Sequence, residues 1–535
     1  MGEKMSKIAI EEKKGIFAKI LDSIEMIGNK LPHPMALFGL FCLTIMIISA
    51  IAAGLGISVE GELINRTTNT LEKQTITAIS LLSKEGIAYM LENAVQNFVN
   101  FAPLGMVLVG MLGIGTAEGS GYISALLKKT VSLTPAKLVT PMVVFLGVIS
   151  NIASDAGYVV LVPLGALIFM SFKRHPLAGL AAGFAGVSGG FSANLIVGTT
   201  DPMLAGISTE AAKMIDPNYT VTATSNMFFM IASTFLITLL GWFVTDKIVE
   251  PRLGEYNGGL NFSKEDNDLR NLTDKEEKAL NITNIVVLSM ILLIVVVTLM
   301  PESPLRNLEV EKTSGFVSSI IDNSPLMNGF VPIMAIIFFV PAIVYGRISG
   351  KFKDHKDVCN EMSKSMSSMG GYIALAFIMA QFVQYFSYTN LGTILAIEGA
   401  KVLETMNMNP IVLMIVFVLF TGFINLFMGS ASAKWAIMAP VFLPMFMKLG
   451  ISPELTQVAY RIGDSTTNII SPLMNYFAMI VIFAQKHDKK SGIGTLISTM
   501  MPYTMIFLIG WILLLGIWMA LGLPIGPGAG LHYTI

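Results

Sequence analysis

Residues Tyr460–Pro472 read YRIGDSTTNIISP, and they lie within a long apolar part of the chain. An arginine, an aspartate, an asparagine and several hydroxyl side chains are thus placed where the surrounding residues favour lipid. Charged groups inside a membrane are costly, and they usually face the protein interior or a water-filled cavity. The stretch therefore predicts a polar site inside a membrane-embedded domain.

The composition of the whole chain is that of a membrane protein. Hydrophobic residues make up 53% of the 535 positions and charged residues 13%, whereas soluble domains carry roughly 25% charged residues. Apolar runs of about 20 residues recur, and each can cross a hydrocarbon core of roughly 30 Å. We predict an all-α polytopic protein embedded in a lipid bilayer.

Some classes of function find no support in the composition. The net charge of −1 gives no reason to expect a nucleic acid partner. Two cysteines and five scattered histidines form neither a disulfide framework nor a metal-ligand spacing. No cofactor is expected.

Positive charges and segment lengths indicate how the chain crosses the membrane, because Lys and Arg concentrate in cytoplasmic loops. Residues 1–33 hold six lysines, so we place the N-terminus inside. Two apolar segments are interrupted near their middle, and each arm is too short to span the bilayer. They indicate re-entrant hairpins, in addition to nine spanning segments. The predicted parts are a cytoplasmic segment 1–33, a first repeat 34–245 with hairpin 138–172, a cytoplasmic loop 246–281, a linking transmembrane helix 282–300, a second repeat 326–522 with hairpin 411–446, and a C-terminal tail 523–535.

The two halves of the membrane domain repeat each other in opposite orientation. Asn151 and Asn194 are 43 residues apart, as are Asn425 and Asn468, and 274 positions separate the two pairs. Basic residues precede the helix that opens the first half, but they follow its counterpart in the second half. Inverted repeats with interrupted helices are typical of secondary transporters that bind substrate near the bilayer midplane.

Each of the four interruptions contains an asparagine with serine or threonine nearby. A broken helix leaves backbone N–H and C=O groups without partners, and such side chains can satisfy them. The same side chains can line an ion or substrate site. Both roles stay open for Asn151, Asn194, Asn425 and Asn468. Asp155, at the tip of the first hairpin, is a further charged candidate because intramembrane carboxylates are usually functional.

Three side chains near the second pair of interruptions suggest how a substrate is bound. The planar guanidinium of Arg461 can capture a substrate carboxylate, or it can pair with Asp464 three residues later on the same helix. We favour Asp464 as a cation ligand or proton carrier. Trp435, at the second hairpin, either forms an aromatic wall of the site or packs in the core.

Five motifs together are similar to those of a known family. They are GNKLPHP (28–34), SNIASDAGYVVLVPLGALIF (150–169), GGFSANLIVGTTDPMLAGIS (189–208), SASAKWAIMAPVFLPM (430–445) and YRIGDSTTNIISPLMNYF (460–477). In combination they resemble the AbgT family, the p-aminobenzoyl-glutamate transporters, from about residue 15 to residue 525.

The resemblance implies nine transmembrane helices and two re-entrant hairpins, divided into an inner core and a scaffold. It also implies a homodimer in the bacterial inner membrane and uptake of p-aminobenzoyl-glutamate, coupled to a sodium ion or a proton. Proton-driven export of sulfonamide antimetabolites is the alternative within the family. By motif, the family's substrate residues fall on Asp201, Trp435, Pro453 and Arg461, and its sodium pair falls on Asn425 and Asp464. We add Asn194 and Asn468 to the substrate site, and Asn151 and Asp155 to the cation-coupling set.

Three other functions compete with this expectation. A dicarboxylate carrier of similar inverted-hairpin design would use the same kinds of residue. An ion channel would need a filter repeat or rings of charge, which the sequence lacks. A membrane-embedded hydrolase would need a motif such as HExxH or GxSxG, and Lys434 with Ser432 is a weak dyad. We expect a transporter and not an enzyme.

Overall fold

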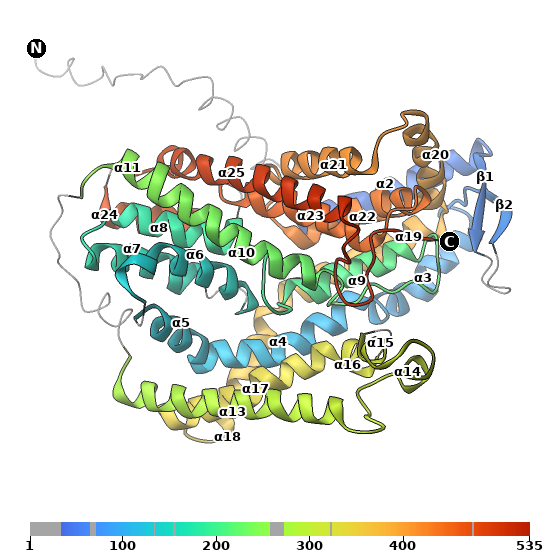
Figure 1. Cartoon of the computed structure of the whole chain (residues 1–535). Helices are drawn as coiled ribbons and strands as arrows, with labels where there is room; N and C mark the ends of the chain where they lie inside the picture. Colours follow the sequence, from blue (N-terminus) through green and yellow to red (C-terminus); the bar gives the residue numbers. More distant parts are fainter. Residues whose placement is uncertain are drawn as a thin grey trace, which may run out of the picture.

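The structure is a computed structural model that describes residues 34–64, 71–132, 134–153, 157–256, 272–321, 324–472, 474, 476–489 and 491–534. The predicted cytoplasmic segment 1–33 and the candidate residue Asp155 lie outside the described residues. Within them, nearly all regular structure is helical (Figure 1). The helical class of the fold is therefore as predicted.

The helices form two series joined by a linking region. The first series comprises α2 (Pro34–Gly54), α3 (Lys84–Val99), α4 (Ala102–Ser120), α5 (Tyr122–Ser132), η1 (Ala136–Leu138), α6 (Val139–Ser150), η2 (Asn151–Ala153), η3 (Gly157–Leu161), α7 (Val162–Ser171), α8 (Pro176–Phe184), η4 (Ala185–Gly189), α9 (Thr200–Ala212), α10 (Met227–Val244), η5 (Thr245–Val249) and α11 (Glu250–Leu253). The linking region holds α13 (Asp274–Leu299), α14 (Leu308–Ser314), α15 (Phe316–Ile321) and α16 (Pro325–Asn328). The second series comprises α17 (Phe330–Ser349), α18 (His355–Ser368), α19 (Gly370–Tyr388), α20 (Leu391–Thr405), α21 (Pro410–Asn425), α22 (Ala431–Lys448), α23 (Pro453–Asn468), α24 (Phe477–His487) and α25 (Ile493–Ala520).

Six stretches of helix among the described residues are long and apolar enough to cross a membrane. They contain α2, α3 with α4, α10 with its extension, α13, α17 and α25, and the bent pair of α18 and α19 forms a seventh. Two more of the predicted crossings are interrupted, since α8 and α9 are separated by a loop, as are α23 and α24. The exact number of nine crossings stays a prediction.

One helix lies almost wholly at the outside of the fold. α13 runs along the edge of the molecule beside α17 (Figure 1). Only 11% of its apolar window is buried, and Ile285, Leu288 and Leu292 are exposed. An apolar helix without a polar face requires lipid or another protein around it. This face therefore suits a membrane environment.

The two series share one order of elements at the offset of 274 residues. α6 and α7 correspond to α21 and α22, α8 and α9 to α23 and α24, and α10 to α25. In both halves an asparagine at the end of the first arm donates through Nδ2 to a carbonyl oxygen 39 residues later. These bonds join Asn151 to Gly190 at 3.4 Å and Asn425 to Asp464 at 2.8 Å. The same contact thus supports an interruption in each half.

The interruptions fall inside the two segments predicted as hairpins. Segment 138–172 contains α6 and, after the break that begins at Asn151, η3 with α7. Segment 411–446 contains α21 and α22, separated by residues 426–430. Ser430 caps α22, because its Oγ accepts a hydrogen bond from Ala433 N at 3.3 Å. Entry of both arms from one side of the bilayer stays a prediction.

One part of the expected all-α fold is wrong. Strands β1 (Ser58–Ile64) and β2 (Leu71–Thr77) pair antiparallel after α2. Val59 and Ile76 face each other in the ladder, and both are buried against Ile394 of α20. Polar residues alternate with Val59, Gly61 and Leu63 along β1, and a period of two suits a strand with one buried face, whereas β2 carries a polar run from Glu72 to Thr75. The prediction used only the scarcity of Lys and Arg in this segment and missed the alternation.

The predicted loop 246–281 is partly helical. η5 and α11 extend α10 to Leu253, and α13 begins at Asp274 rather than at 282. The earlier start is set by a capping box, in which the Thr273 side chain and the Glu276 side chain satisfy each other's backbone N–H groups. Residues 257–271 of this loop lie outside the described part of the chain.

The C-terminal tail holds the beginning of α23 in place. Ser452 N donates to Leu531 O at 3.1 Å, and Tyr533 N donates to Gly450 O at 2.9 Å. Nearer the start of the tail, Ile525 O accepts a hydrogen bond from Phe229 N of α10 at 3.1 Å. The tail predicted at 523–535 is therefore a structural part of the second half, because it ties α10 to α23.

Helix α23 packs closely against α21 around Gly463. A Cβ atom at this position would lie 2.4 Å from Val418 O and 2.8 Å from Gly422 N. Small residues at such a crossing allow two helix backbones to approach. This approach brings the next residue, Asp464, within reach of Asn425.

The variant Gly463→Ala tests this packing. We expect it to lower the free energy of unfolding by about 1–3 kcal/mol, because the added methyl group overlaps backbone atoms that cannot move aside. The melting temperature of the purified protein in detergent measures the effect. Gly105→Ala in α4 is the matched control, since nothing lies within 4 Å of its Cβ position. Equal melting temperatures for both variants would contradict the close packing.

Candidate functional site

The opening motif forms the second half of α23, and every residue of this helix is buried. Its polar residues Glu454, Gln457, Arg461, Asp464 and Asn468 recur at intervals of three and four, so they share one face of the helix. A helix buried on all sides is ordinarily apolar. The polar face of α23 therefore needs partners from neighbouring elements.

Two buried ion pairs compensate the charges of Arg461 and Asp464 on this face. Arg461 Nη1 lies 2.6 Å from Asp201 Oδ1, and Lys434 Nζ lies 2.5 Å from Asp464 Oδ1. Of the two roles left open for Arg461, the pairing with Asp464 is not formed in the structure. Both residues are on one helix, but α9 and α22 each bring an opposite charge directly to one of them. The correct partners are far away in the sequence and could not be read from spacing.

The Arg461 pair joins the two halves of the fold. Asp201 is the second residue of α9, where the positive end of the helix dipole favours a carboxylate. Its Oδ2 accepts a hydrogen bond from Gly198 N at 2.6 Å. Neither Asp201 Oδ1 nor Arg461 Nε has an aligned hydrogen-bond partner, although both atoms are buried. The contact is thus an ion pair in which the Nε–H of Arg461 has no hydrogen-bond partner.

A chain of hydrogen bonds connects Arg461 with Trp435. Trp435 Nε1 donates to Ser208 Oγ at 3.0 Å, and Ser208 Oγ donates to Gln457 Oε1 at 2.6 Å. Gln457 Nε2 and Arg461 Nη1 both donate to Asn226 Oδ1, at 2.7 and 3.4 Å. The sequence reasoning missed the three linking residues. Gln457 was detectable, because it precedes Arg461 by one helical turn.

Trp435 is fully buried and packs on an aromatic partner. Its ring centroid lies 4.4 Å from that of Tyr460, with 33° between the planes. The Tyr460 hydroxyl donates to the carbonyl of Ala431 at the start of α22. The aromatic pair therefore fixes the start of α22 against α23, next to Arg461.

The second ion pair belongs to a cluster at the second interruption. Lys434 Nζ also donates to Asn425 Oδ1. Asn425 Nδ2 donates to Asp464 O, to Thr467 Oγ1 and to Asn468 Oδ1, at 2.8, 2.9 and 2.8 Å. Asn425 and Asp464 are thus together, as the resemblance implied. Asn468, which we had added to the substrate site, lies in this cluster beside them.

The weak Lys434 and Ser432 dyad is not formed. Lys434 Nζ is directed at Asn425 and Asp464, whereas Ser432 Oγ lies 3.4 Å from Ser430 Oγ. A serine nucleophile needs its base within hydrogen-bond distance. The geometry at this hairpin therefore gives no support to a hydrolase.

The first-half asparagines bond backbone groups and, among the described residues, make no hydrogen bond to either ion pair. Asn151 Nδ2 bonds backbone carbonyls, including Val148 O at 3.0 Å, while its Oδ1 is buried without a partner. Asn194 Oδ1 accepts from Leu195 N at 3.1 Å and shapes its own loop. The link to α23 is made by neighbouring residues, since Ser192 N donates to Ser465 Oγ at 3.0 Å.

Pro453 is not brought together with Arg461. It is the first residue of α23, and eight residues of helix place it roughly 12 Å along the axis from Arg461. Its neighbour Glu454 accepts a hydrogen bond from the Tyr219 hydroxyl at 2.9 Å. Burial and the nearby carboxylate raise the pKa of Tyr219, so the phenol remains a donor.

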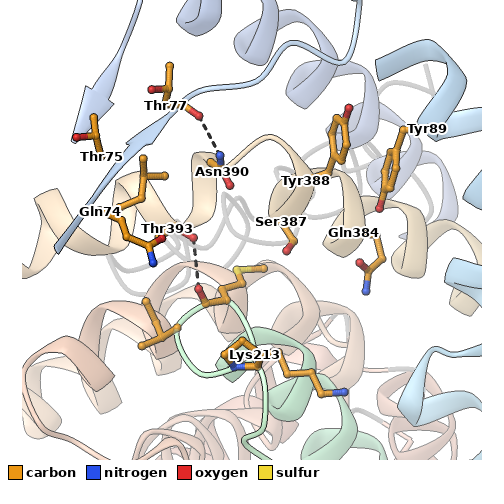
Figure 2. A pocket seen from close by; sticks show the side chains of 14 residues that line it. Gln74, Thr75, Thr77, Tyr89, Lys213, Gln384, Ser387, Tyr388, Asn390 and Thr393 are labelled. Atoms are coloured by element: carbon orange, nitrogen blue, oxygen red, sulfur yellow. Dashed lines mark hydrogen bonds between the residues drawn. The ribbon is translucent and has the colours of Figure 1, made fainter. Parts of the chain in front are cut away.

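Two cavities share Lys213, which follows the end of α9. One, of about 570 Å³, lies between β2 and the segment from α19 to α20, and its lining is mainly polar (Figure 2). Tyr89 and Tyr388 stack in its wall with ring centroids 3.9 Å apart. The other, of about 780 Å³, reaches Ser225 and Glu454. Because Asn226 follows Ser225, this larger cavity lies next to the Arg461 network.

Comparison with known proteins places these features in one family. The profile of the AbgT putative transporter family matches residues 19–533. The chain is 36% identical over 524 residues to the p-aminobenzoyl-glutamate transport protein of Escherichia coli strain K12, and the match covers 98% of each chain.

Two solved structures are also similar. The Alcanivorax borkumensis YdaH transporter, described as having an unusual topology, has a TM-score of 0.85 and 44% identity over 93% of this chain and 100% of that one. Neisseria gonorrhoeae MtrF, described with a class of antimetabolite efflux pumps, has a TM-score of 0.87 and 47% identity over 95% of this chain and 100% of that one. With matches over nearly its whole length, this chain belongs to the AbgT family of membrane transporters.

Proposed function

We propose that the chain is an ion-coupled secondary transporter of p-aminobenzoyl-glutamate, or of a related aromatic amino-acyl carboxylate, across the bacterial cytoplasmic membrane. The observation that carries the proposal is the buried Arg461 guanidinium, whose Nε–H has no aligned partner. A buried donor without a partner is costly. A carboxylate matches the guanidinium fork best. The name of the Escherichia coli relative supports this substrate.

The aromatic side chains beside Arg461 suit the ring of such a substrate. Trp435 and Tyr460 already pack against each other with tilted rings, so a substrate ring reaches them only when α22 shifts against α23. Secondary transporters rock one group of helices against another around the site. In this proposal the substrate carboxylate engages Arg461 and its ring replaces part of the contact between Trp435 and Tyr460.

A second candidate is proton-driven export of sulfonamide-type antimetabolites. The similarity to Neisseria gonorrhoeae MtrF, described with antimetabolite efflux pumps, favours it. A sulfonamide shares the aromatic amine of p-aminobenzoyl-glutamate but lacks its two carboxylates. Export of such compounds would therefore depend less on Arg461 than uptake of p-aminobenzoyl-glutamate does.

The proposal includes a homodimer with a cytoplasmic N-terminus. The family resemblance supports the dimer, and the six lysines of residues 1–33 support the orientation. Native mass spectrometry of the detergent-solubilised protein distinguishes a dimer from a monomer.

Transport into proteoliposomes, with sodium and proton gradients imposed separately and in both directions, tests the function. We expect saturable uptake of labelled p-aminobenzoyl-glutamate that one of the two gradients accelerates. Linear flux without saturation would indicate a channel. Competition by succinate but not by glutamate peptides would indicate a dicarboxylate carrier, and gradient-driven export of sulfonamides alone would support the second candidate.

Removal of the Arg461 guanidinium tests the carboxylate role. In Arg461→Gln combined with Asp201→Asn, no buried charge is left unpaired. We expect KM for p-aminobenzoyl-glutamate to rise about ten- to hundredfold, since charge-assisted hydrogen bonds of roughly 1.5–3 kcal/mol are lost. Asp201→Asn alone shows how much of the rise in KM comes from loss of the Asp201 carboxylate. Arg252→Gln, at the exposed contact with Ser498, is the control. Wild-type KM in the double variant would contradict the role.

Labelling of Cys359 tests the orientation. This thiol is exposed on α18, next to the basic residues that predict the cytoplasmic side. In a Cys42→Ser background, a membrane-impermeant maleimide should label Cys359 in inverted vesicles but not in intact cells. Labelling in intact cells would place α18 outside and reverse the predicted topology.

A further inference from the structure

The ammonium group of Lys434 stands between the two residues onto which the family's sodium pair falls. Nζ contacts Asn425 Oδ1 and lies 2.5 Å from Asp464 Oδ1. The Lys434 side chain is 1% exposed, and so is that of Asp464. A positive charge thus already occupies the centre of this oxygen pair.

The surrounding hydrogen bonds direct the oxygen of Asn425 toward this charge. The amide nitrogen of Asn425 is surrounded by three acceptors, which are Asp464 O, Thr467 Oγ1 and Asn468 Oδ1. An amide presents two N–H donors at one end and an acceptor at the other. With the nitrogen held by acceptors, Oδ1 has to face Lys434. The cluster is therefore built to present oxygen to a cation.

The equivalent position in the first half lacks both charges. At the offset of 274 residues, Val160 stands for Lys434 and Gly190 stands for Asp464. Asn151 keeps the bond of its amide nitrogen to the backbone, yet its Oδ1 has no partner. The lysine thus occurs only at the second interruption of the two. The hydrogen bond from the asparagine amide to the backbone, which both halves share, does not require it.

Two cations cannot share this oxygen pair. The Lys434 and Asp464 charges compensate each other in a region without solvent, where interactions between charges are strong. A sodium ion bound to the same two oxygens would lie within a few ångströms of the ammonium group, and the two would repel each other. Binding of one therefore requires that the other has left.

We propose that the Lys434 ammonium is a tethered cation that occupies the place of a free sodium ion between Asn425 Oδ1 and Asp464 Oδ1, so that sodium and Lys434 exclude each other there. In this arrangement the protein supplies the cation from its own chain. The inference rests on the proposed ion-coupled function for its role in transport. Its test uses binding alone, so a failed transport assay does not decide it.

Sodium binding to the purified full-length protein tests the proposal. The probes are the melting temperature in sodium chloride against choline chloride at equal ionic strength, and binding of radioactive sodium. In Lys434→Met we expect the half-saturating sodium concentration to fall by about tenfold or more relative to wild type, because a competitor that holds most of the sites is removed. The added variant Asp464→Asn should abolish this gain.

Matched variants keep the test decisive. Lys401→Met removes a lysine that pairs with Glu398 at 2.8 Å on an exposed side chain, and it should not change sodium binding. If Lys434→Met does not fold, Lys434→Gln replaces it as the test variant. Wild-type protein with sodium binding as tight as Lys434→Met, lost in Asp464→Asn, would overturn the proposal. Absence of Asp464-dependent binding in both Lys434 variants would overturn it as well.

Discussion

The structure depends on the burial of one polar helix inside an apolar protein. Helix α23 carries a row of charged and amide side chains, and all its residues are buried. At membrane depth no water is present to satisfy such groups, so each needs a protein partner. The neighbouring elements are arranged accordingly. α9 brings Asp201 to Arg461, α22 brings Lys434 to Asp464, and α21 brings Asn425 within hydrogen-bond distance.

The two ion pairs have different structural consequences. The pair of Arg461 and Asp201 crosses from the second half of the chain to the first, so it couples the positions of the two halves. The pair of Lys434 and Asp464 stays within the second half and fixes α22 against α23. Any motion that separates these elements has to break a buried pair, which is strongly unfavourable unless a ligand replaces the missing partner. A ligand that took the place of one of these partners would therefore shift the conformation, because a ligand shifts an equilibrium only by binding the two states differently.

Much of the fold followed from patterns that are local in the sequence. Composition and run length indicated a helical membrane protein, and the polar interruptions at Asn151 and Asn425 marked the ends of α6 and α21. The equal spacing of the asparagines indicated a repeat whose order of elements the structure shares. Strand β1 was missed because charge scarcity was used where alternation was the informative pattern, and β2 was missed because its polar run at 72–75 shows no such alternation. The linking residues Ser208 and Asn226 were missed because single polar residues in apolar segments have many possible roles.

The sequence by itself determined which groups would have to be buried together, because lipid and apolar neighbours leave intramembrane charges no other place. It did not determine how they pair. Arg461 and Asp464 are close in the chain, yet each takes a partner from another helix, 260 positions away for Arg461 and 30 for Asp464. Coulomb attraction depends on distance in space, and that distance is set by the packing of α9 and α22 against α23. Only the tertiary structure therefore decided that Arg461 joins the two halves and that Lys434 stands at the expected sodium pair.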